Sequence, residues 1–450
     1  MTTAEETDQL APWTKTVPTG WKVTRLDAVA DVLFSNVDKH TIEGEKSVRL
    51  CNYVDVYKND RITGSIDFME ASAEEREIKK FQIQRGDVLA TKDSEEADDI
   101  AIASLVAEEL PGVLCGYHLA MIRPRFASVS GSYLAWLHFS KSFRAQYEAK
   151  AVGVTRFGLS QYAFRAARIP LPPPSEQLRI GAYLDASCAA IDAAVAAKHR
   201  QLEILAAISK AIVTKAVTVG INTSAEMRNS GIEWIGEIPR QWKMEKLKYL
   251  TSLIVDGTHI TPTYVPEGVP FLRVTDIQGT QIDLERVKYI SNDEHQILSQ
   301  RAKARRGDIL LSKNGTIGLV KVVNWDWEFS FFVSLCLLRP TGRLNSRYFT
   351  YFFQSSVVDQ QLIESSKKTS VTNLHLVKIR ELLICVPAPK EQEAIADFLD
   401  AKLADMQRIV TGIETQIATL TAYRKSLIHE CVTGQRRITE ADLNHVKAHG

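Results

Sequence analysis

The sequence predicts an α+β protein that contains the same unit twice, each copy being an α+β domain followed by a long helix. Three observations predict this fold class. The segments PSEQLRIGAYLDA, from Pro174, and PKEQEAIADFLDA, from Pro389, lie 215 residues apart. Ahead of each segment, short runs rich in β-forming residues lie between Gly and Asn turns. After each segment, apolar residues recur with alternating spacings of three and four.

The internal repeat covers about residues 17–219 and 238–434. RGDVLATK, from Arg85, matches RGDILLSK, from Arg306, at an offset of 221 residues, and Arg123-Pro124 matches Arg339-Pro340 at an offset of 216. Because the offset decreases between collinear blocks, a small deletion within a duplication explains it better than chance.

The repeat divides the chain into seven predicted segments. Runs such as GDILLSK and FFVSLCLLRP predict strands, and GSYLAWLHFSKSF predicts a helix. Each long helix is expected to begin where a proline cluster is followed by acids, which the helix dipole favours in the first turn. The segments are an N-terminal extension (1–16), the first α+β domain (17–172), the first long helix (173–219), a polar linker (220–237), the second α+β domain (238–387), the second long helix (388–434) and a C-terminal tail (435–450).

The two long helices each carry an apolar seam with a period of 3.5 residues, which indicates coiled-coil pairing. Because the seams occupy the same register of the repeat, we expect the helices to pair with each other. Antiparallel pairing would relate the two α+β domains by a rough two-fold axis, and the polar linker could span either a parallel or an antiparallel arrangement. The alternative is that each helix packs only on its own domain. The first seam is Leu184, Cys188, Ile191, Val195, Lys198, Leu202, Leu205, Ser209, Ile212 and Ala216; the second is Leu399, Leu403, Met406, Val410, Ile413, Ile417, Leu420, Arg424, Leu427 and Cys431.

Composition gives weaker indications of function. The 450 residues include 55 Lys and Arg against 54 Asp and Glu, a net charge of +1. Neutralisation of phosphates supplies most affinity for DNA, so a DNA-binding role would require basic partner proteins. The six cysteines lack C-x-x-C or zinc spacing, which predicts free buried thiols in a reducing compartment. With no run of eighteen apolar residues and no signal peptide, we expect a cytoplasmic protein.

Sequence motifs for catalysis are missing. There is no G-x-x-x-x-G-K-[ST] phosphate loop, no F-x-G-x-G cofactor loop, no H-E-x-x-H and no G-x-S-x-G. The only Pro-Pro stretch, PLPPPSE, is not followed by the aromatic residue that an amino-methyltransferase needs. We therefore expect no catalytic residue, no metal site and no cofactor bound by this chain.

The paired P-x-x-EQ helices, the openings VPTGWKVTRLDAV and IPRQWKMEKLKYL, and GDILLSKNGTIG together resemble the DNA-specificity subunits of type I restriction-modification systems. The resemblance spans nearly the whole chain. It implies that each α+β domain is a target-recognition domain that reads one half of a bipartite site in double-stranded DNA. It also implies that the two helices form an antiparallel coiled coil with pseudo-two-fold symmetry, which spaces the half-sites. It also implies that two modification subunits methylate adenine with S-adenosylmethionine and that restriction subunits use ATP and Mg²⁺.

The stretch LLSKNGTIG supplies the first candidate DNA contacts, because it predicts a turn between two strands. Asn can pair with adenine, and Lys can bind guanine or phosphate. Alternatively this is a plain hairpin in which Asn314 serves the turn conformation. The candidates here are Lys313, Asn314 and Thr316. The first copy keeps Lys92 but is acidic after it; either those acids bind cytosine amines or, as we favour, they face away from DNA.

Three further regions supply basic or polar candidates, and for each the alternative is a solvated loop. IVDGTHITPTY resembles a loop found early in such domains, and its counterpart is LFSNVDKHTIEG. AKAVGVTRFGLS and ESSKKTSVTN precede the long helices and could contact phosphates. The candidates are Thr258 and His259, Asn36 and Lys39, Lys150 and Arg156, and Lys367 and Lys368. Two rival functions are a scaffold that binds only protein and a fused methyltransferase or nuclease.

Overall fold

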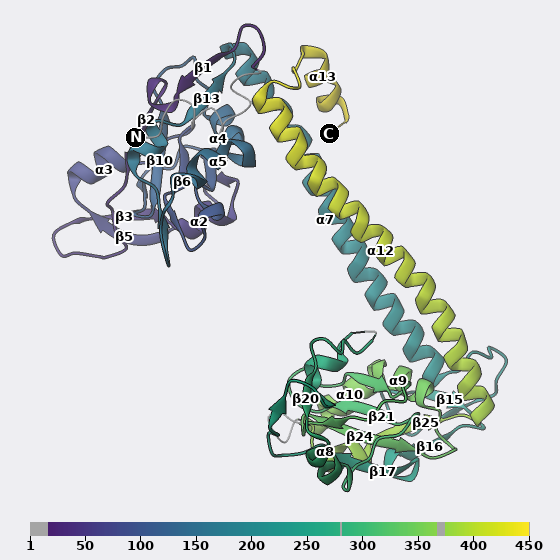
Figure 1. The fold of residues 1–450 in the computed structure, drawn as a ribbon. Helices are drawn as coiled ribbons and strands as arrows, with labels where there is room; N and C mark the ends of the chain where they lie inside the picture. Colours follow the sequence, from purple (N-terminus) through teal and green to yellow (C-terminus); the bar gives the residue numbers. More distant parts are fainter. Residues whose placement is uncertain (1–16, 280, 367–373, 450) are drawn as a thin grey trace. The chain divides into compact units, whose positions relative to one another are not determined.

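The computed structural model describes residues 17–279, 281–366 and 374–449. The chain divides into two compact units (Figure 1). The first unit combines Met1–Lys198 with Thr415–Gly450, and the second is His199–Glu414. Each unit therefore contains one α+β domain together with the beginning of one long helix and the end of the other.

The first unit is built on a five-stranded sheet in the order β2-β10-β6-β8-β4 and a three-stranded sheet in the order β5-β3-β9. Strand β1 (Lys22–Arg25) pairs with β13 (Arg168–Leu171), which brings the two ends of the domain together. The remaining strands are β2 (Ala30–Phe34), β3 (Lys46–Cys51), β4 (Arg61–Ile62), β5 (Met69–Ala73), β6 (Val88–Thr91), β7 (Asp93–Ser94), β8 (Ala103–Val106), β9 (Val113–Cys115), β10 (Leu119–Pro124), β11 (Val152–Gly153) and β12 (Phe157–Gly158); the short helices are α2 (Tyr53–Lys58), α3 (Glu75–Phe81), α4 (Gly131–Phe139), α5 (Lys141–Glu148) and α6 (Gln161–Arg165).

The second unit repeats this plan with two four-stranded sheets, in the orders β17-β24-β21-β22 and β18-β20-β19-β23. Its domain ends are joined by β16 (Lys243–Lys246) and β25 (Leu383–Val386). The other elements are β17 (Thr251–Asp256), β18 (Tyr264–Val265), β19 (Val269–Leu272), β20 (Lys288–Ile290), β21 (Ile309–Ser312), β22 (Val320–Val322), β23 (Ser330–Phe331), β24 (Leu335–Pro340), α8 (Asn292–Ser299), α9 (Ser346–Gln354), α10 (Ser356–Ser366) and α11 (Leu376–Glu381).

Two of the repeated sequence motifs form the same buried ion pair in each unit. Arg123 donates from Nε and Nη2 to the two oxygens of Asp87, over 2.8 and 2.6 Å. Arg339 makes the same two bonds to Asp308, over 2.9 and 2.7 Å. Both carboxylates are almost fully buried, so a bidentate partner is needed to offset their desolvation. The RGD and RP motifs thus hold the central sheet together.

The long helices α7 (Pro174–Thr218) and α12 (Pro389–Thr433) begin with the same anchor. The side-chain oxygen of Gln177 accepts from Ser130 N, and its amide donates to the carbonyl of Pro172. Gln392 makes the equivalent bonds to Asn345 N and the Pro387 carbonyl. The glutamine of each EQ pair therefore ties the first turn of a long helix to the preceding domain.

The end of each long helix packs on the other copy's domain. Tyr133, in the first domain, donates its hydroxyl proton toward the carbonyls of Pro170 and Val432, the latter near the end of α12. Tyr348, in the second domain, contacts the carbonyls of Cys385 and Val217 in the same way. One helix begins and the other ends on the same domain, so the helices run antiparallel within each unit.

The predicted seam is the buried stripe of both helices. All twenty seam positions are buried or half-buried. Between residues 400 and 426, all positions outside the seam are exposed. In the second unit Ser209 lies 3.3 Å from the sulfur of Met406, and in the first unit Arg424 pairs with Asp192 at 3.0 Å. The structure confirms the predicted α+β fold with paired antiparallel helices, so the helices do not pack only on their own domains.

Two segments are more ordered than the sequence suggested. In the linker, β14 (Met227–Asn229) pairs with β15 (Glu237–Pro239), which begins at the last linker residue and continues into the second domain. Within the C-terminal tail, Arg437 forms an ion pair with the buried Glu176 and is followed by α13 (Glu440–His449). Glu176 also accepts from the indole of Trp21, so this acid is a packing residue as well as a favourable first-turn charge.

Helix α7 contains a window that could cross a membrane by length and composition, with a mean hydropathy of 1.4. The sequence expectation considered only uninterrupted apolar runs and missed this window. The apolar face of the helix, including Ile180, Leu184 and Ile191, packs in the core of the first unit. We therefore assign α7 to the core of a folded protein rather than to a membrane.

Candidate nucleic-acid interface

Lys92 lies at a loop-bearing edge of the first domain, directly after β6. Its ammonium group is 3.3 Å from the carbonyl oxygen of Ser35 and lies over the rings of Tyr117 and Phe34, at 4.4 and 5.1 Å from their centroids. Among the described residues no carboxylate lies within ion-pair distance of it. Burial lowers the pKa of Lys92, because desolvation disfavours the charged form of a half-buried amine. This amine remains available to an anionic or acceptor ligand.

Lys313 occupies the equivalent position after β21 in the second domain, but its surroundings differ. Its ammonium group is 2.6 Å from Asp256 Oδ1, and the side chain is only 5% exposed. The backbone equivalence is close, because Lys92 N donates to His118 O and Lys313 N donates to Ser334 O. The structure therefore gives Lys313 a structural partner that Lys92 lacks.

The segment after Lys313 connects β21 to β22, which pair antiparallel as predicted. The left-handed conformation falls on Gly315 and Gly318, with φ of 71° and 91°, so Asn314 is not needed for that conformation. The Oδ1 atom of Asn314 is buried and has no hydrogen-bond partner among the described residues. Thr316 is exposed, and its carbonyl accepts a bond from the Ser312 hydroxyl.

Thr258 and His259 lie beside Lys313, on the loop that follows β17. The Thr258 hydroxyl accepts from Ile260 N over 3.1 Å, which shapes a tight turn. His259 is exposed, and its Nε2 atom is 4.0 Å from Asp256 Oδ2. The structure thus brings four candidates of the second domain, Thr258, His259, Lys313 and Asn314, to one edge around Asp256.

The candidates of the first domain gather less tightly. Asn36 follows Ser35, is exposed, and donates to Glu77 Oε1 over 2.5 Å. Lys39 is exposed farther along the same loop. Arg156 pairs with Asp93, which also contacts His118 Nδ1 at 2.8 Å. Asp93 follows Lys92 in the chain, so Asn36, Lys92 and Arg156 share one edge.

Lys150 lies just after α5, on the segment that leads to the β11–β12 hairpin. Burial lowers its pKa, and the nearby Arg25 guanidinium lowers it further. The guanidinium of Arg25 lies over the exposed ring of Tyr162 at 5.8 Å. The remaining two candidates, Lys367 and Lys368, lie outside the described residues.

Sequence reasoning missed the neighbouring residues that determine the electrostatic environment of each lysine. Tyr117 and His118 border Lys92, and Asp256 neutralises Lys313. A signal for the pairing was present, since Ser35 and Asp256 align at the same offset of 221 residues as the two lysines. That comparison gives a serine in one copy and an aspartate in the other.

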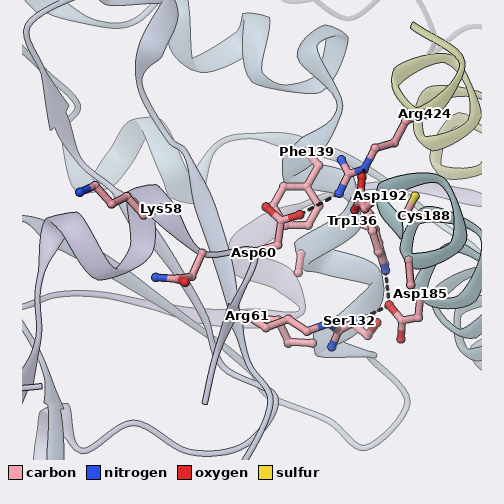
Figure 2. A pocket seen from close by; sticks show the side chains of 14 residues that line it. Lys58, Asp60, Arg61, Ser132, Trp136, Phe139, Asp185, Cys188, Asp192 and Arg424 are labelled. Carbon is pink, nitrogen blue, oxygen red and sulfur yellow. Dashed lines mark hydrogen bonds and ion pairs between the residues drawn. The ribbon is translucent and has the colours of Figure 1, made fainter. Parts of the chain in front are cut away.

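A cavity of about 460 Å³ lies in the first unit between the α+β domain and the long helices (Figure 2). Both arginines that line it are paired with carboxylates: Arg424 pairs with Asp60 and Asp192, and Arg61 pairs with Asp185, which also accepts from the Trp136 indole over 2.6 Å. Arg424 is thus a seam residue whose charge is used to hold the domain on the helices. We assign this cavity a structural role.

The six cysteines are free and buried, as predicted. Within residues 17–279, 281–366 and 374–449, no cluster of three or more His, Cys, Asp or Glu residues is placed to hold a metal ion.

Comparison with known proteins agrees with the repeated architecture. The family model described as "Type I restriction modification DNA specificity domain" matches residues 239–419. The chain is 24% identical over 310 residues to the EcoBI specificity subunit of Escherichia coli, a match that covers 66% of this chain and 64% of that protein. It is 23% identical over 437 residues to the putative MjaX specificity subunit of Methanocaldococcus jannaschii, covering 94% and 95% of the two chains.

Two solved structures share the fold. One, from a study of complex assembly and conformational transition of the type I R-M system, aligns with a TM-score of 0.71 at 19% identity and covers 92% of this chain and 98% of that chain. The HsdS subunit from Thermoanaerobacter tengcongensis aligns with a TM-score of 0.54 at 20% identity, covering 93% and 98%. The duplicated domains and antiparallel helices therefore accompany a similarity to DNA-specificity subunits of type I restriction-modification systems, which extends over nearly the whole chain in the Methanocaldococcus jannaschii relative.

Proposed function

We propose that this chain is the non-catalytic DNA-recognition subunit of a type I restriction-modification complex, and that each α+β domain reads one half of a bipartite site. The observation that carries this proposal is the pair of equivalent edges around Lys92 and Lys313. A shared backbone presents different side chains at the two edges, as two different half-sites would require. Sequence is read by side chains that reach base edges, whereas phosphate contacts only position the protein.

The long helices are proposed to set the spacing of the half-sites and to bind the partner subunits. The seam residues of the two helices are covered by the helix pairing. Outside the seam, four large apolar side chains remain exposed in the second unit: Ile204, Ile208, Phe398 and Ile409. Apolar side chains at such positions are suited to a protein interface. Two modification subunits would dock there and methylate adenine.

The net charge of +1 supports a division of labour between subunits. With so little excess positive charge, the chain would depend on basic partners to hold the duplex. S-adenosylmethionine would be bound by the modification subunits, and ATP and Mg²⁺ by the restriction subunits. The complex would work in the cytoplasm, where chromosomal and incoming DNA are both accessible.

Inserting one heptad into each long helix, after Val195 and after Val410, tests the spacing role. The seam stays in register, so pairing is expected to survive. Each insertion adds about 10.5 Å of helix, or roughly three base pairs at about 3.4 Å per pair. Three pairs also rotate the duplex by roughly 100°. We expect methylation at the parental site to be lost and at best weak methylation at a longer-spaced site.

The measurement is methylome sequencing of cells that carry the variant together with its modification subunit. A four-residue insertion in α7 alone is the control, because it breaks the seam and should abolish methylation at every spacing. Full methylation at the parental spacing by the heptad variant would show that the partner subunits, not the helices, set the spacing. A chain that never directs methylation would instead favour the protein-only scaffold.

A further inference from the structure

The three most exposed large apolar side chains among the described residues lie at the edges that carry the equivalent lysines. They are Val154, Val152 and Ile260, which are 93%, 79% and 77% exposed. Single exposed apolar residues are ordinary on protein surfaces. Here, however, Val154 and Val152 lie on the segment next to β7, the strand that follows Lys92, and Ile260 lies on the loop next to Lys313.

In the first unit, the β11–β12 hairpin holds the valines at this edge. Strand β12 pairs with β7, so that Gly158 lies opposite Asp93, and Leu159 N donates to the Lys92 carbonyl over 2.8 Å. The tip is fixed further by the Arg156–Asp93 ion pair. A Cβ on Gly153 would lie 1.9 Å from the Arg156 carbonyl oxygen, so the tight hairpin requires glycine there. The hydrogen-bonded β11–β12 hairpin therefore holds Val154 on its exposed side.

In the second unit, a turn holds Ile260 outward. Thr258 is bound through its backbone N to the Phe331 carbonyl, and its hydroxyl accepts from Ile260 N. A Cβ on Gly257 would lie 2.2 Å from the Phe331 carbonyl oxygen, which shows how closely the loop lies against its neighbour. Ile260 thus projects from a turn that is anchored beside Asp256 and Lys313.

We propose that Val154 and Ile260 are base-reading contacts that pack against the C5-methyl group of a thymine in the major groove, one in each half-site. This inference rests on the proposed function, since it assigns a ligand group to the same two edges. An apolar side chain is the group that distinguishes thymine at the major-groove edge. At the first edge the charges fit a DNA occupant, because Lys92 has no carboxylate partner among the described residues and Lys150 lies on the same domain.

The test uses the complex of the full chain with its modification subunit and a duplex carrying the methylated motif found by methylome sequencing. Each thymine of the motif is replaced in turn by uracil, which removes only the C5-methyl group. Loss of one buried methyl contact should weaken binding about fourfold. With the wild-type chain, we expect uracil to weaken binding in this way at one thymine of each half-site. Val154→Ser should abolish this difference between thymine and uracil in the first half-site only, and Ile260→Ser should abolish it in the second half-site only.

Val377→Ser is the matched control, because Val377 is 72% exposed but lies on α11, where it lines a surface hollow with Gln361 and Leu382. This control variant should leave unchanged the ratio of the binding affinities for the thymine-containing and uracil-containing duplexes at every position. Ratios that stay at the wild-type value in both test variants, or a half-site without any A·T pair, would overturn the proposal. So would weaker assembly of Val154→Ser with the modification subunit in the absence of DNA, since the tip would then contact protein. If the wild-type complex shows no sequence preference, the proposed function itself fails.

Discussion

Lys92 and Lys313 hold the same place in two copies of one domain, yet one ammonium group lies between aromatic rings and the other is neutralised by a buried carboxylate. The scaffold around them is conserved to the level of single bonds, as shown by the pairs Asp87–Arg123 and Asp308–Arg339. The difference teaches that the duplication preserved the bonds that build the domain and changed the side chains at one edge. This is the pattern expected where a common frame serves two different ligands.

The largest expected effect is on stability, from Lys313→Ala. Removal of the ammonium group takes from the Asp256 carboxylate, whose side chain is 10% exposed, its partner at 2.6 Å and leaves the His259 Nε2 atom at 4.0 Å. Breaking a buried ion pair by deleting one partner costs about 3–5 kcal/mol. The loss should appear as faster hydrogen exchange in β21 and β24 of the second unit, measured by mass spectrometry.

Lys92→Ala is the matched comparison, because it removes the equivalent cation without stranding a carboxylate. Its effect on exchange in β6 and β10 should be small, while DNA binding by the assembled complex weakens at the first half-site. The double change Asp256→Ala and Lys313→Ala should recover part of the lost stability. Equal destabilisation by Lys92→Ala and Lys313→Ala would contradict the difference between the two edges.

A smaller effect is expected from acid, and only in the first unit. His138 on α4 is fully buried, and burial lowers its pKa from 6.5 to about 4. The folded domain therefore keeps the imidazole neutral while the unfolded chain protonates it below pH 6.5. Stability from this residue is complete above pH 6.5 and falls by about 3 kcal/mol as the pH approaches 4.

The second copy has Phe353 at the corresponding position, which does not titrate. His138→Phe should therefore flatten the dependence of the first unit's unfolding free energy on pH between 6.5 and 4. It should also lower stability by a constant amount, because the Tyr147 hydroxyl loses its contact with His138 Nε2. Denaturant titrations at several pH values measure this, and an unchanged slope in the variant would show that other groups cause the acid sensitivity.

The architecture was predictable because it follows from sequence patterns that recur at fixed intervals. The duplication, the two seams and the strands of the GDILLSK type each follow from periodicity, which does not depend on distant contacts. The ordered linker and tail were missed because their order depends on tertiary partners. Arg437 binds Glu176, 261 residues earlier in the chain, and no local signal announces such a contact.

The candidate site was predictable only in part. Turn residues and basic clusters indicated Lys92, Lys313, Thr258 and His259, which the structure places at equivalent edges. Their electrostatic character was not predictable from one segment, because the Asp256 carboxylate comes from a strand 57 residues away from Lys313. Exposure of Val154 and Ile260 also depends on the folded backbone. Which side chains contact bases stays a prediction.

The most direct test of the central claim, that each domain reads its own half-site, is to replace residues 238–387 with a second copy of residues 17–172. Both domains would then carry the Lys92 edge on the original pair of helices. Methylome sequencing of cells that express this chain with the modification subunit should reveal a new palindromic motif, made of two inverted copies of the first half-site. Methylation of the unchanged parental motif would contradict the account, because the second half would then be read by something other than residues 238–387.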